Sequence, residues 1–209
     1  MLLGNTLIWF SLIMTGLAMV LYLPGIRQGK HTPYLKQARW AVYAAALGMT
    51  AGLALLWYLL LTHQYQYEYV YSYSGRDMQL RYVISALWGG QEGTFLLWAA
   101  FAGYLAVFLR FKGKAYEPAV QFFYMGITFF LLLMLTKASP FKLLDFVPED
   151  GRGLNPLLQD PWMTIHPPIT FFGFASLGIP AAYAMAALIK EDWDAWIPRA
   201  LPWTVFGVL

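Results

Sequence analysis

Two short segments of the chain contain the residue types from which cofactor sites are commonly built. Residues 88–93 read Trp-Gly-Gly-Gln-Glu-Gly, and residues 162–168 read Trp-Met-Thr-Ile-His-Pro-Pro. Glycines let the backbone come close to a neighbouring group, and histidine is a frequent metal ligand. Any binding chemistry of the chain is therefore expected at these two segments.

His166 is the first residue of interest because two prolines, Pro167 and Pro168, follow it directly. Proline suits the first turn of a helix, so we expect these two to open one and to hold His166 at its amino end. That end carries partial positive charge, which disfavours a protonated imidazole. A neutral imidazole is the form that binds a metal, so the position suits an iron ligand. The alternative is a simple hydrogen-bonding histidine, which is the commoner role at a helix start.

The glycine-rich segment has a structural and a functional interpretation. In the structural one, the glycines form a turn, Glu92 lies at the positive end of the following helix, and Thr94 caps that helix. This interpretation leaves a neighbouring tryptophan and glutamine unexplained. The candidate cofactor contacts in this segment are Trp88, Gly89, Gly90, Gln91 and Glu92.

The remaining histidines and acids are weaker candidates. His31 falls in a basic loop and is expected to be solvated, whereas His63 ends an apolar run and could meet His166. Glu92 and Asp160 are expected as contacts in loops outside the membrane. None of these residues has the partners that acid–base catalysis requires, and we assign no catalytic residue.

Other chemistries have little support in the sequence. The chain has no cysteine, so it forms no disulfide and has no Cys/His zinc spacing. The long apolar runs carry no charged residue in their middles, which argues against a transporter or a channel. The net charge of +3 is too small to indicate a nucleic-acid partner.

Long apolar runs place the chain in a membrane. Of 209 residues, 59% are hydrophobic and 12% are charged, against roughly a quarter charged in soluble domains. A helix needs about 20 apolar residues to cross a bilayer, and backbone in lipid must satisfy its own hydrogen bonds. We predict one all-α domain over residues 1–209, a multi-pass transmembrane helix bundle with about five complete spans and the start of a sixth. The expected spans are Leu2–Leu23, Trp40–Thr62, Thr94–Phe111, Ala119–Thr136 and Pro167–Ile189, with the sixth starting at Ala200.

The basic residues are divided unequally between the two ends of these spans. Loops 24–39 and 110–118 and the segment after the fifth span together hold nine lysines and arginines, whereas the opposite loops hold five. The positive-inside rule places the richer side in the cytoplasm. The amino terminus is then expected outside, together with the two longest loops, 63–93 and 137–166.

Two parts of loop 63–93 have a pattern of their own. Residues 65–73 carry five tyrosines at alternate positions, the period of a strand with one aromatic face. We interpret them as an aromatic belt at the membrane–water boundary, with contact to a ligand or a peptide as the alternative. Residues 77–88 carry apolar residues at helical spacing, which predicts an amphipathic helix lying in the outer interface.

The two candidate segments also carry a family resemblance. Residues 84–98, Ile-Ser-Ala-Leu-Trp-Gly-Gly-Gln-Glu-Gly-Thr-Phe-Leu-Leu-Trp, and residues 153–168 are similar to the amino-terminal part of the CcmF/NrfE family, the membrane subunits of bacterial cytochrome c haem lyases. Leu3-Gly4-Asn5 before the first span fits as well. The resemblance covers essentially the whole chain in order, and both motifs are long and specific. It implies a protein of the bacterial inner membrane that acts in cytochrome c biogenesis.

The resemblance implies a cofactor and partners. His166 matches an outer-side histidine of the family that is thought to be an axial ligand of haem. The haem is transient and arrives on a periplasmic chaperone of the CcmE type, while other subunits present the apocytochrome to which it is attached. The cofactor supplies the chemistry, and the protein binds and orients it.

The chain also departs from the family pattern. Full-length members have more spans, a tryptophan-rich outer segment, a second outer histidine and a membrane histidine pair, and none of these is visible in the 209 residues. We therefore expect a truncated or split member that needs the remaining part of the haem lyase. The alternative function is a non-catalytic membrane scaffold that docks other assembly subunits through residues 65–88.

Overall fold

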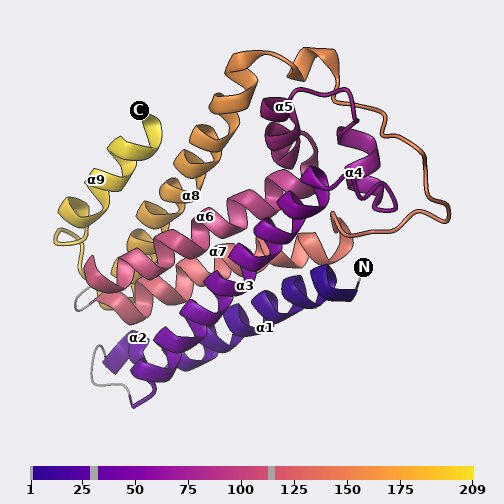
Figure 1. Cartoon of the computed structure of the whole chain (residues 1–209). Helices are drawn as coiled ribbons and strands as arrows, with labels where there is room; N and C mark the ends of the chain where they lie inside the picture. The colour runs from indigo at the N-terminus through magenta and orange to yellow at the C-terminus, as the bar shows by residue number, and fades with distance from the viewer. Residues whose placement is uncertain (1, 29–32, 113–115) are drawn as a thin grey trace.

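The computed structural model describes residues 2–28, 33–112 and 116–209 and consists of helices joined by loops (Figure 1). Within these ranges there is no β-strand, only an isolated antiparallel bridge between Tyr67 and Leu143. The all-α prediction is therefore confirmed. In chain order the elements are α1 (Leu2–Tyr22), α2 (Gly25–Gln28), α3 (Leu35–Leu61), α4 (Glu68–Tyr73), α5 (Leu80–Ser85), η2 (Ala86–Trp88), α6 (Gln91–Lys112), α7 (Glu117–Lys137), η4 (Pro156–Leu158), α8 (Pro161–Lys190) and α9 (Ile197–Val208).

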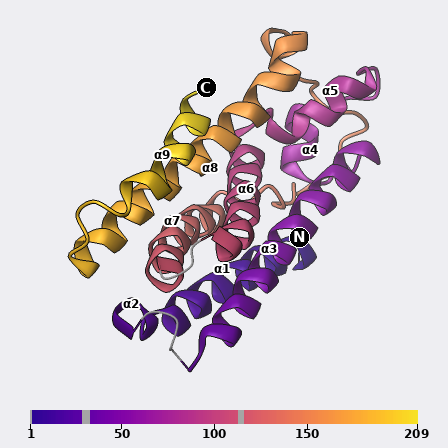
Figure 2. The same cartoon turned by 90° about the vertical axis from the view of Figure 1, so that its left-hand side faces the viewer.

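Among the described residues, five helices are long and apolar enough to cross a membrane, as predicted: α1, α3, α6, α7 and α8. They form three layers, with α1 and α3 on one side, α6 and α7 in the middle, and α8 and α9 on the other side (Figure 2). The expected start of a sixth span corresponds to α9, which packs along α8. The expected solvation of His31 falls outside the described residues.

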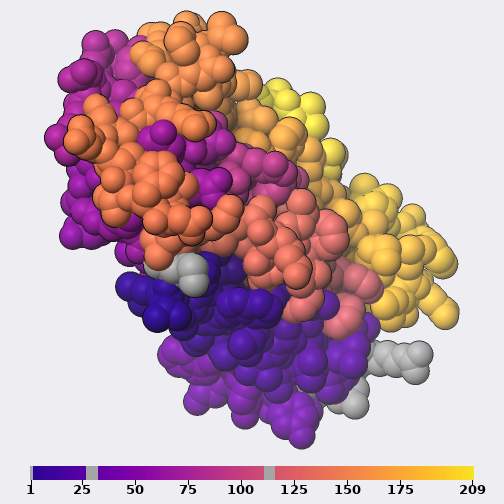
Figure 3. Space-filling view, turned by 90° about the vertical axis from the view of Figure 1, so that its right-hand side faces the viewer, coloured from indigo at the N-terminus to yellow at the C-terminus, as the bar shows by residue number. Residues whose placement is uncertain are grey.

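Both long loops gather at the same end of the bundle, beside the start of α1 (Figure 1). Backbone hydrogen bonds join them: the Glu68 amide donates to the Lys142 carbonyl at 2.9 Å, and the Arg152 amide donates to the Tyr71 carbonyl at 2.7 Å. The space-filling view shows the loop after α7, in orange, lying over this end next to the purple atoms of α4 and α5 (Figure 3). The two loops are therefore one structural unit.

Residues 68–73 of the tyrosine-rich segment form helix α4, and residues 65–67 lie in the turn and bridge before it, so the predicted strand is wrong. A residue type that recurs at every second position also recurs at every fourth, and every fourth residue lies on one face of a helix. Tyr69 of α4 and Tyr65 of the preceding turn enter the core, where they are 4% and 3% exposed. Tyr73 follows on the same face, with its ring centroid 4.6 Å from that of Tyr69. Tyr65 and Tyr69 thus pack inside the protein instead of forming a belt at its surface.

The predicted interfacial helix starts later than expected. Residues 77–79 form turns, and the helix begins at Leu80 and tightens into η2. Val83 and Leu87 of the apolar stripe are buried against the bundle, whereas Leu80 is exposed. The Trp57 indole of α3 donates to the Ile84 carbonyl at 3.2 Å. This helix is therefore packed onto α3 as part of the fold.

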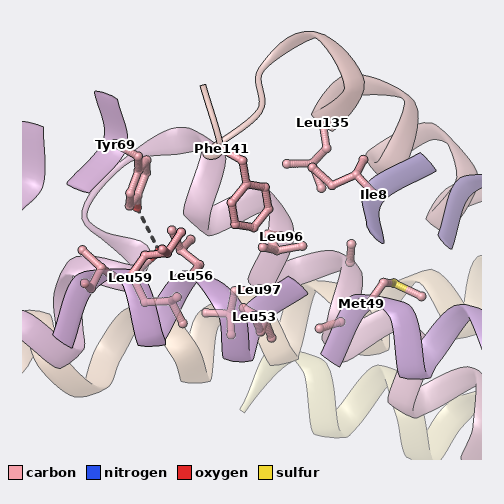
Figure 4. Close-up of a cluster of buried hydrophobic side chains, with 14 of the residues drawn as sticks. Ile8, Met49, Leu53, Leu56, Leu59, Tyr69, Leu96, Leu97, Leu135 and Phe141 are labelled. Carbon is pink, nitrogen blue, oxygen red and sulfur yellow. Dashed lines mark hydrogen bonds between the residues drawn. The ribbon is translucent and has the colours of Figure 1, made fainter. Parts of the chain in front are cut away.

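A buried aromatic ring anchors the start of the loop after α7. Phe141 is fully buried, and its side chain points toward Leu96, with Leu135 and Ile8 close by (Figure 4). A Cβ at position 4 would overlap this ring, so Gly4 is needed for the close approach of α1. The Ser139 hydroxyl donates to the Asn5 side-chain oxygen at 2.5 Å. Gly4 and Asn5 thus tie the amino terminus to the loop.

At the opposite end an ion pair joins α3 to the first turn of α7. The Arg39 guanidinium donates to both carboxylate oxygens of Glu117, each at 2.6 Å. The Glu117 side chain is 1% exposed, whereas that of Arg39 is 27% exposed. The buried carboxylate of Glu117 therefore depends on the ion pair more than the part-exposed guanidinium of Arg39 does.

We predict that Arg39→Leu lowers the free energy of unfolding by about 3 to 5 kcal/mol, because it leaves a buried carboxylate without a partner. Glu117→Leu should cost less, because the freed guanidinium is part-exposed and can turn to the membrane surface. Chemical unfolding in mixed micelles measures both values, with the exposed Glu191→Leu as the control. Equal losses for the two variants would contradict this description of the pair.

Candidate functional site

His166 lies inside α8, and the prediction that its two prolines open the helix is wrong. The helix begins at Pro161, six residues before Pro167. The Asp160 side chain caps it by accepting from the Trp162 amide at 2.8 Å. Asp160 is thus the cap of the helix, and Pro161 is the first-turn proline, the role that was predicted for Pro167 and Pro168. The helix dipole acts mainly within the first turn, so it no longer explains a neutral imidazole at His166.

Two prolines inside the helix remove two backbone donors. Pro167 and Pro168 cannot donate to the carbonyls four residues earlier, those of Met163 and Thr164. The Trp88 indole donates to the Met163 carbonyl at 3.2 Å. Trp88 thus supplies the hydrogen bond that Pro167 takes away. This contact joins the two segments that the sequence marked separately.

Three glycines before and within the first turn of α6 make room for side chains of both long loops. A Cβ on Gly93 would overlap the Tyr69 ring, and a Cβ on Gly90 would overlap the Tyr73 ring. A Cβ on Gly89 would come within 2.8 Å of Leu154 in the other outer loop. The glycine-rich segment is therefore a packing surface for both outer loops.

The Tyr69 hydroxyl is the polar centre of this surface. It accepts from the Gly90 amide at 3.1 Å and lies 2.9 Å from each of the Ala86 and Leu87 carbonyl oxygens, to which it donates. Burial raises the pKa of the Tyr69 phenol above its ordinary value, so the hydroxyl keeps its proton. It satisfies the backbone at the junction of η2 and α6 (Figure 4).

The start of α6 differs from its prediction in one respect. The helix begins at Gln91, with Glu92 in its first turn as expected for an acid at the positive end. Thr94 is not the cap, because its hydroxyl donates backward to the Gly90 carbonyl at 2.8 Å. Gly90 directly precedes the helix, so no capping side chain is present there.

His166 is exposed and faces a groove between α8 and α9. Its Nε2 lies 3.3 Å from the Thr170 hydroxyl, which donates to the His166 carbonyl at 3.0 Å. The groove has a volume of ≈ 630 Å³. Its walls are apolar except at His166 and Thr170, and they are formed by His166, Ile169, Thr170, Phe172, Gly173, Phe174, Phe206, Gly207, Val208 and Leu209. An imidazole at the edge of an aromatic groove can ligate the metal of a flat apolar cofactor.

The structure brings only part of the predicted site together. Trp88 contacts the backbone one helical turn before His166, and Gln91 is exposed nearby in sequence. Glu92 lines a different pocket, formed by α4 and the end of α7, and none of its walls comes from α8. Gly90 is buried beneath Tyr73. A direct cofactor contact by these residues stays a prediction.

Two other candidates have structural roles. The His63 Nδ1 lies 3.1 Å from the Tyr65 hydroxyl, at the turn that ends α3, and Asp160 caps α8. In the described ranges no three His, Cys, Asp or Glu side chains are grouped to hold a metal ion.

Sequence reasoning missed the two groups that organise the site, the Tyr69 hydroxyl and the Met163 carbonyl. The four-residue spacing of the tyrosines was a usable signal for Tyr69, because it indicates a helix with a buried face. For Met163 the signal was the pair of prolines, which frees a carbonyl once the helix is known to start at Pro161.

A family model, related sequences and a solved structure all match the chain to the same group of proteins. Residues 88–205 match the family model described as Cytochrome C assembly protein, which is more than half of the chain. The chain is 34% identical over 174 residues to the cytochrome c-type biogenesis protein ccl1 of Rhodobacter capsulatus, covering 77% of this chain and 26% of that protein. It is 30% identical over 210 residues to CcmF of Haemophilus influenzae, covering 97% of this chain and 32% of that protein.

A solved structure, that of the cytochrome c haem lyase CcmF, has the same fold. The TM-score is 0.82 at 27% sequence identity, over 99% of this chain and 33% of that chain. The 209 residues thus span about a quarter to a third of the length of the relatives that they match.

We predict that Trp88→Phe lowers the free energy of unfolding by about 1 to 3 kcal/mol, because phenylalanine keeps an aromatic ring but leaves the Met163 carbonyl without its donor. Hydrogen exchange should rise in residues 161–166, where α8 is weakened. Unfolding in mixed micelles and exchange mass spectrometry measure these effects. Trp162→Phe, at an exposed position of the same helix, is the matched control, and an equal effect there would overturn the role given to the Trp88 indole.

Proposed function

The chain belongs to the cytochrome c assembly protein family, and from this membership we propose that it handles haem on the outer side of a bacterial cytoplasmic membrane. Its role is in cytochrome c maturation, as the membrane subunit that holds haem for covalent attachment to apocytochrome c. The relatives that the chain matches are cytochrome c-type biogenesis proteins, and the matched solved structure is a haem lyase.

The observation that carries the proposal is the exposed imidazole of His166 at an aromatic groove. Histidine is a common axial ligand of haem iron. The groove offers Phe172 and Phe174 as apolar walls beside this imidazole. A planar macrocycle with one open axial position fits this arrangement of donor and apolar surface.

The chain's own residues bind and orient rather than transfer protons. Haem supplies the iron and the vinyl carbons that react with cysteine thiols, and the protein contributes position. Trp88 holds the backbone of α8 one turn before His166. Gly89 and Gly90 act through packing under α4 and Leu154, and Gln91 is free to reach a ligand because it is exposed.

The chain supplies part of a larger site. Haem is usually held by protein on both faces, and the 209 residues cover about a third or less of the relatives. The remaining part of the haem lyase would complete the pocket, a haem chaperone of the CcmE type would deliver the cofactor transiently, and apocytochrome c-presenting subunits would bring the thiols.

The orientation places the amino terminus and His166 outside. The loop charges favour this orientation under the positive-inside rule. Both long loops lie at one end of the bundle, so they share one side of the membrane, and the loop charges assign that side (Figure 1). The Trp88–Met163 contact joins α8 to the end of η2 three residues before His166, a rise of about 4.5 Å along the helix.

We predict that His166→Ala removes the Soret absorption of the chain purified after co-expression with the haem-delivery system and the rest of the lyase. Loss of an iron ligand should lower haem content about tenfold or more. His63→Ala, in the same outer region, is the matched control and should keep its haem. Haem-stain yield of a reporter cytochrome c should fall in parallel with the absorption.

The alternative, a scaffold without haem contact, predicts a different result. His166→Ala would then leave the Soret band and the cytochrome yield unchanged, while substitutions within residues 65–88 would abolish maturation by disturbing the docking surface. That outcome would remove His166 from the proposed function.

A further inference from the structure

A charged pocket lies at the outer end of the bundle, separate from the His166 groove. It has a volume of ≈ 370 Å³. Its walls come from α4, from the first turn of α6, and from the end of α7 with the residues after it. The lining residues are Glu68, Tyr69, Ser72, Tyr73, Glu92, Lys137, Ala138, Ser139 and Lys142.

One anion and one cation in this pocket have no partner in the described parts of the chain. Glu68 and Lys142 pair with each other at 2.7 Å. Glu92 and Lys137 form no such ion pair within the described ranges. One carboxylate oxygen of Glu92, Oε2, is buried and has no hydrogen-bond partner. A buried carboxylate oxygen without a donor is costly, so its geometry calls for an N–H or O–H group from outside the chain.

An apolar groove begins one helical turn deeper on the same two helices. It has a volume of ≈ 530 Å³ and runs between α6 and α7. Phe95 lies three residues after Glu92, and Met134 lies three residues before Lys137, so each shares a helix face with its charged neighbour. The groove is lined entirely by apolar side chains, namely Phe95, Trp98, Phe123, Gly126, Ile127, Phe130, Leu131 and Met134.

We propose that the pocket and the groove together bind one phospholipid with a primary-amine head group, phosphatidylethanolamine. Its ammonium group donates to Glu92, its phosphate lies against Lys137, and an acyl chain fills the groove. The unpaired carboxylate and the unpaired ammonium match the two charges of this head group. A choline head group has the same charges but no N–H, so it leaves the buried Glu92 oxygen unsatisfied.

The position of the pocket agrees with a lipid. Glu92 is in the first turn of α6 and Lys137 is in the last turn of α7, so both lie at the membrane boundary, while Phe95 and Trp98 lie about 4.5 to 9 Å deeper. Within the described ranges no cluster of metal-ligating side chains competes for the pocket. A bound lipid would join α4, α6 and α7 at the point where the outer loops meet the bundle.

Native mass spectrometry of the chain purified gently from its membrane tests the proposal. The wild type should retain phosphatidylethanolamine. Glu92→Gln and Lys137→Gln should each reduce its occupancy about tenfold, because each removes one charged hydrogen bond. Glu149→Gln, an exposed outer-loop substitution, should retain the wild-type occupancy.

A second measurement is independent of purification history and of any folding defect in one variant. Palmitoyl-oleoyl phosphatidylethanolamine added to the delipidated wild type should raise its Tm, and the phosphatidylcholine with the same chains should raise it less. Glu92→Gln should reduce this difference, because Glu92 accepts from the ammonium group. Lys137→Gln should weaken the effect of both lipids, because both carry the phosphate. Equal effects of the two lipids, equal occupancy in all variants, or no retained phospholipid because another protein helix fills the groove would each overturn the proposal.

Discussion

A carbonyl freed by proline inside a membrane helix must find another donor, because lipid provides none. Pro167 frees the Met163 carbonyl, and the Trp88 indole meets it at 3.2 Å. This contact joins the start of α8 to the end of η2, and the Tyr82 hydroxyl supports it by donating to the Gln159 carbonyl at 2.6 Å. Without it, the turn before His166 would have a weakened backbone in apolar surroundings. The glycine-rich segment and the histidine segment are thus parts of one structure, although about 75 residues separate them in the chain.

Trp88 can serve this purpose only because its own backbone is held rigidly. The Tyr69 hydroxyl satisfies the peptide groups around it, and Gly90 and Gly93 let the tyrosine rings of α4 approach. The loop after α7 closes over the same region through Leu154 and Phe141. Both outer loops therefore act as one support for the exposed face of α8, and the chain can present His166 at a defined level of the membrane.

The sequence was sufficient for the bundle but not for the site. Apolar runs of span length predict five helices because length and hydrophobicity are local properties. The tyrosine repeat was misread because a two-residue period contains a four-residue one, and only packing decides between strand and helix. Helix α8 begins where Asp160 caps it. Pro167 and Pro168 were the stronger signal in the sequence, so the predicted start of the helix was too late. The proline pair indicates that the Met163 carbonyl is freed, but only the packing shows that the Trp88 indole is its donor. The position of Glu92 in a separate pocket depends on how α4 packs over α6.

A double-mutant cycle of Trp88→Phe with Pro167→Ala tests most directly whether the indole replaces the donor that proline removes. Alanine at position 167 restores an amide to the Met163 carbonyl, so the indole should then matter little. The account predicts that Trp88→Phe costs about 1 to 3 kcal/mol of unfolding free energy with Pro167 present, and less than about 0.5 kcal/mol with alanine there. Equal costs in both backgrounds would show that Trp88 stabilises the fold only through its ring, and would contradict the account.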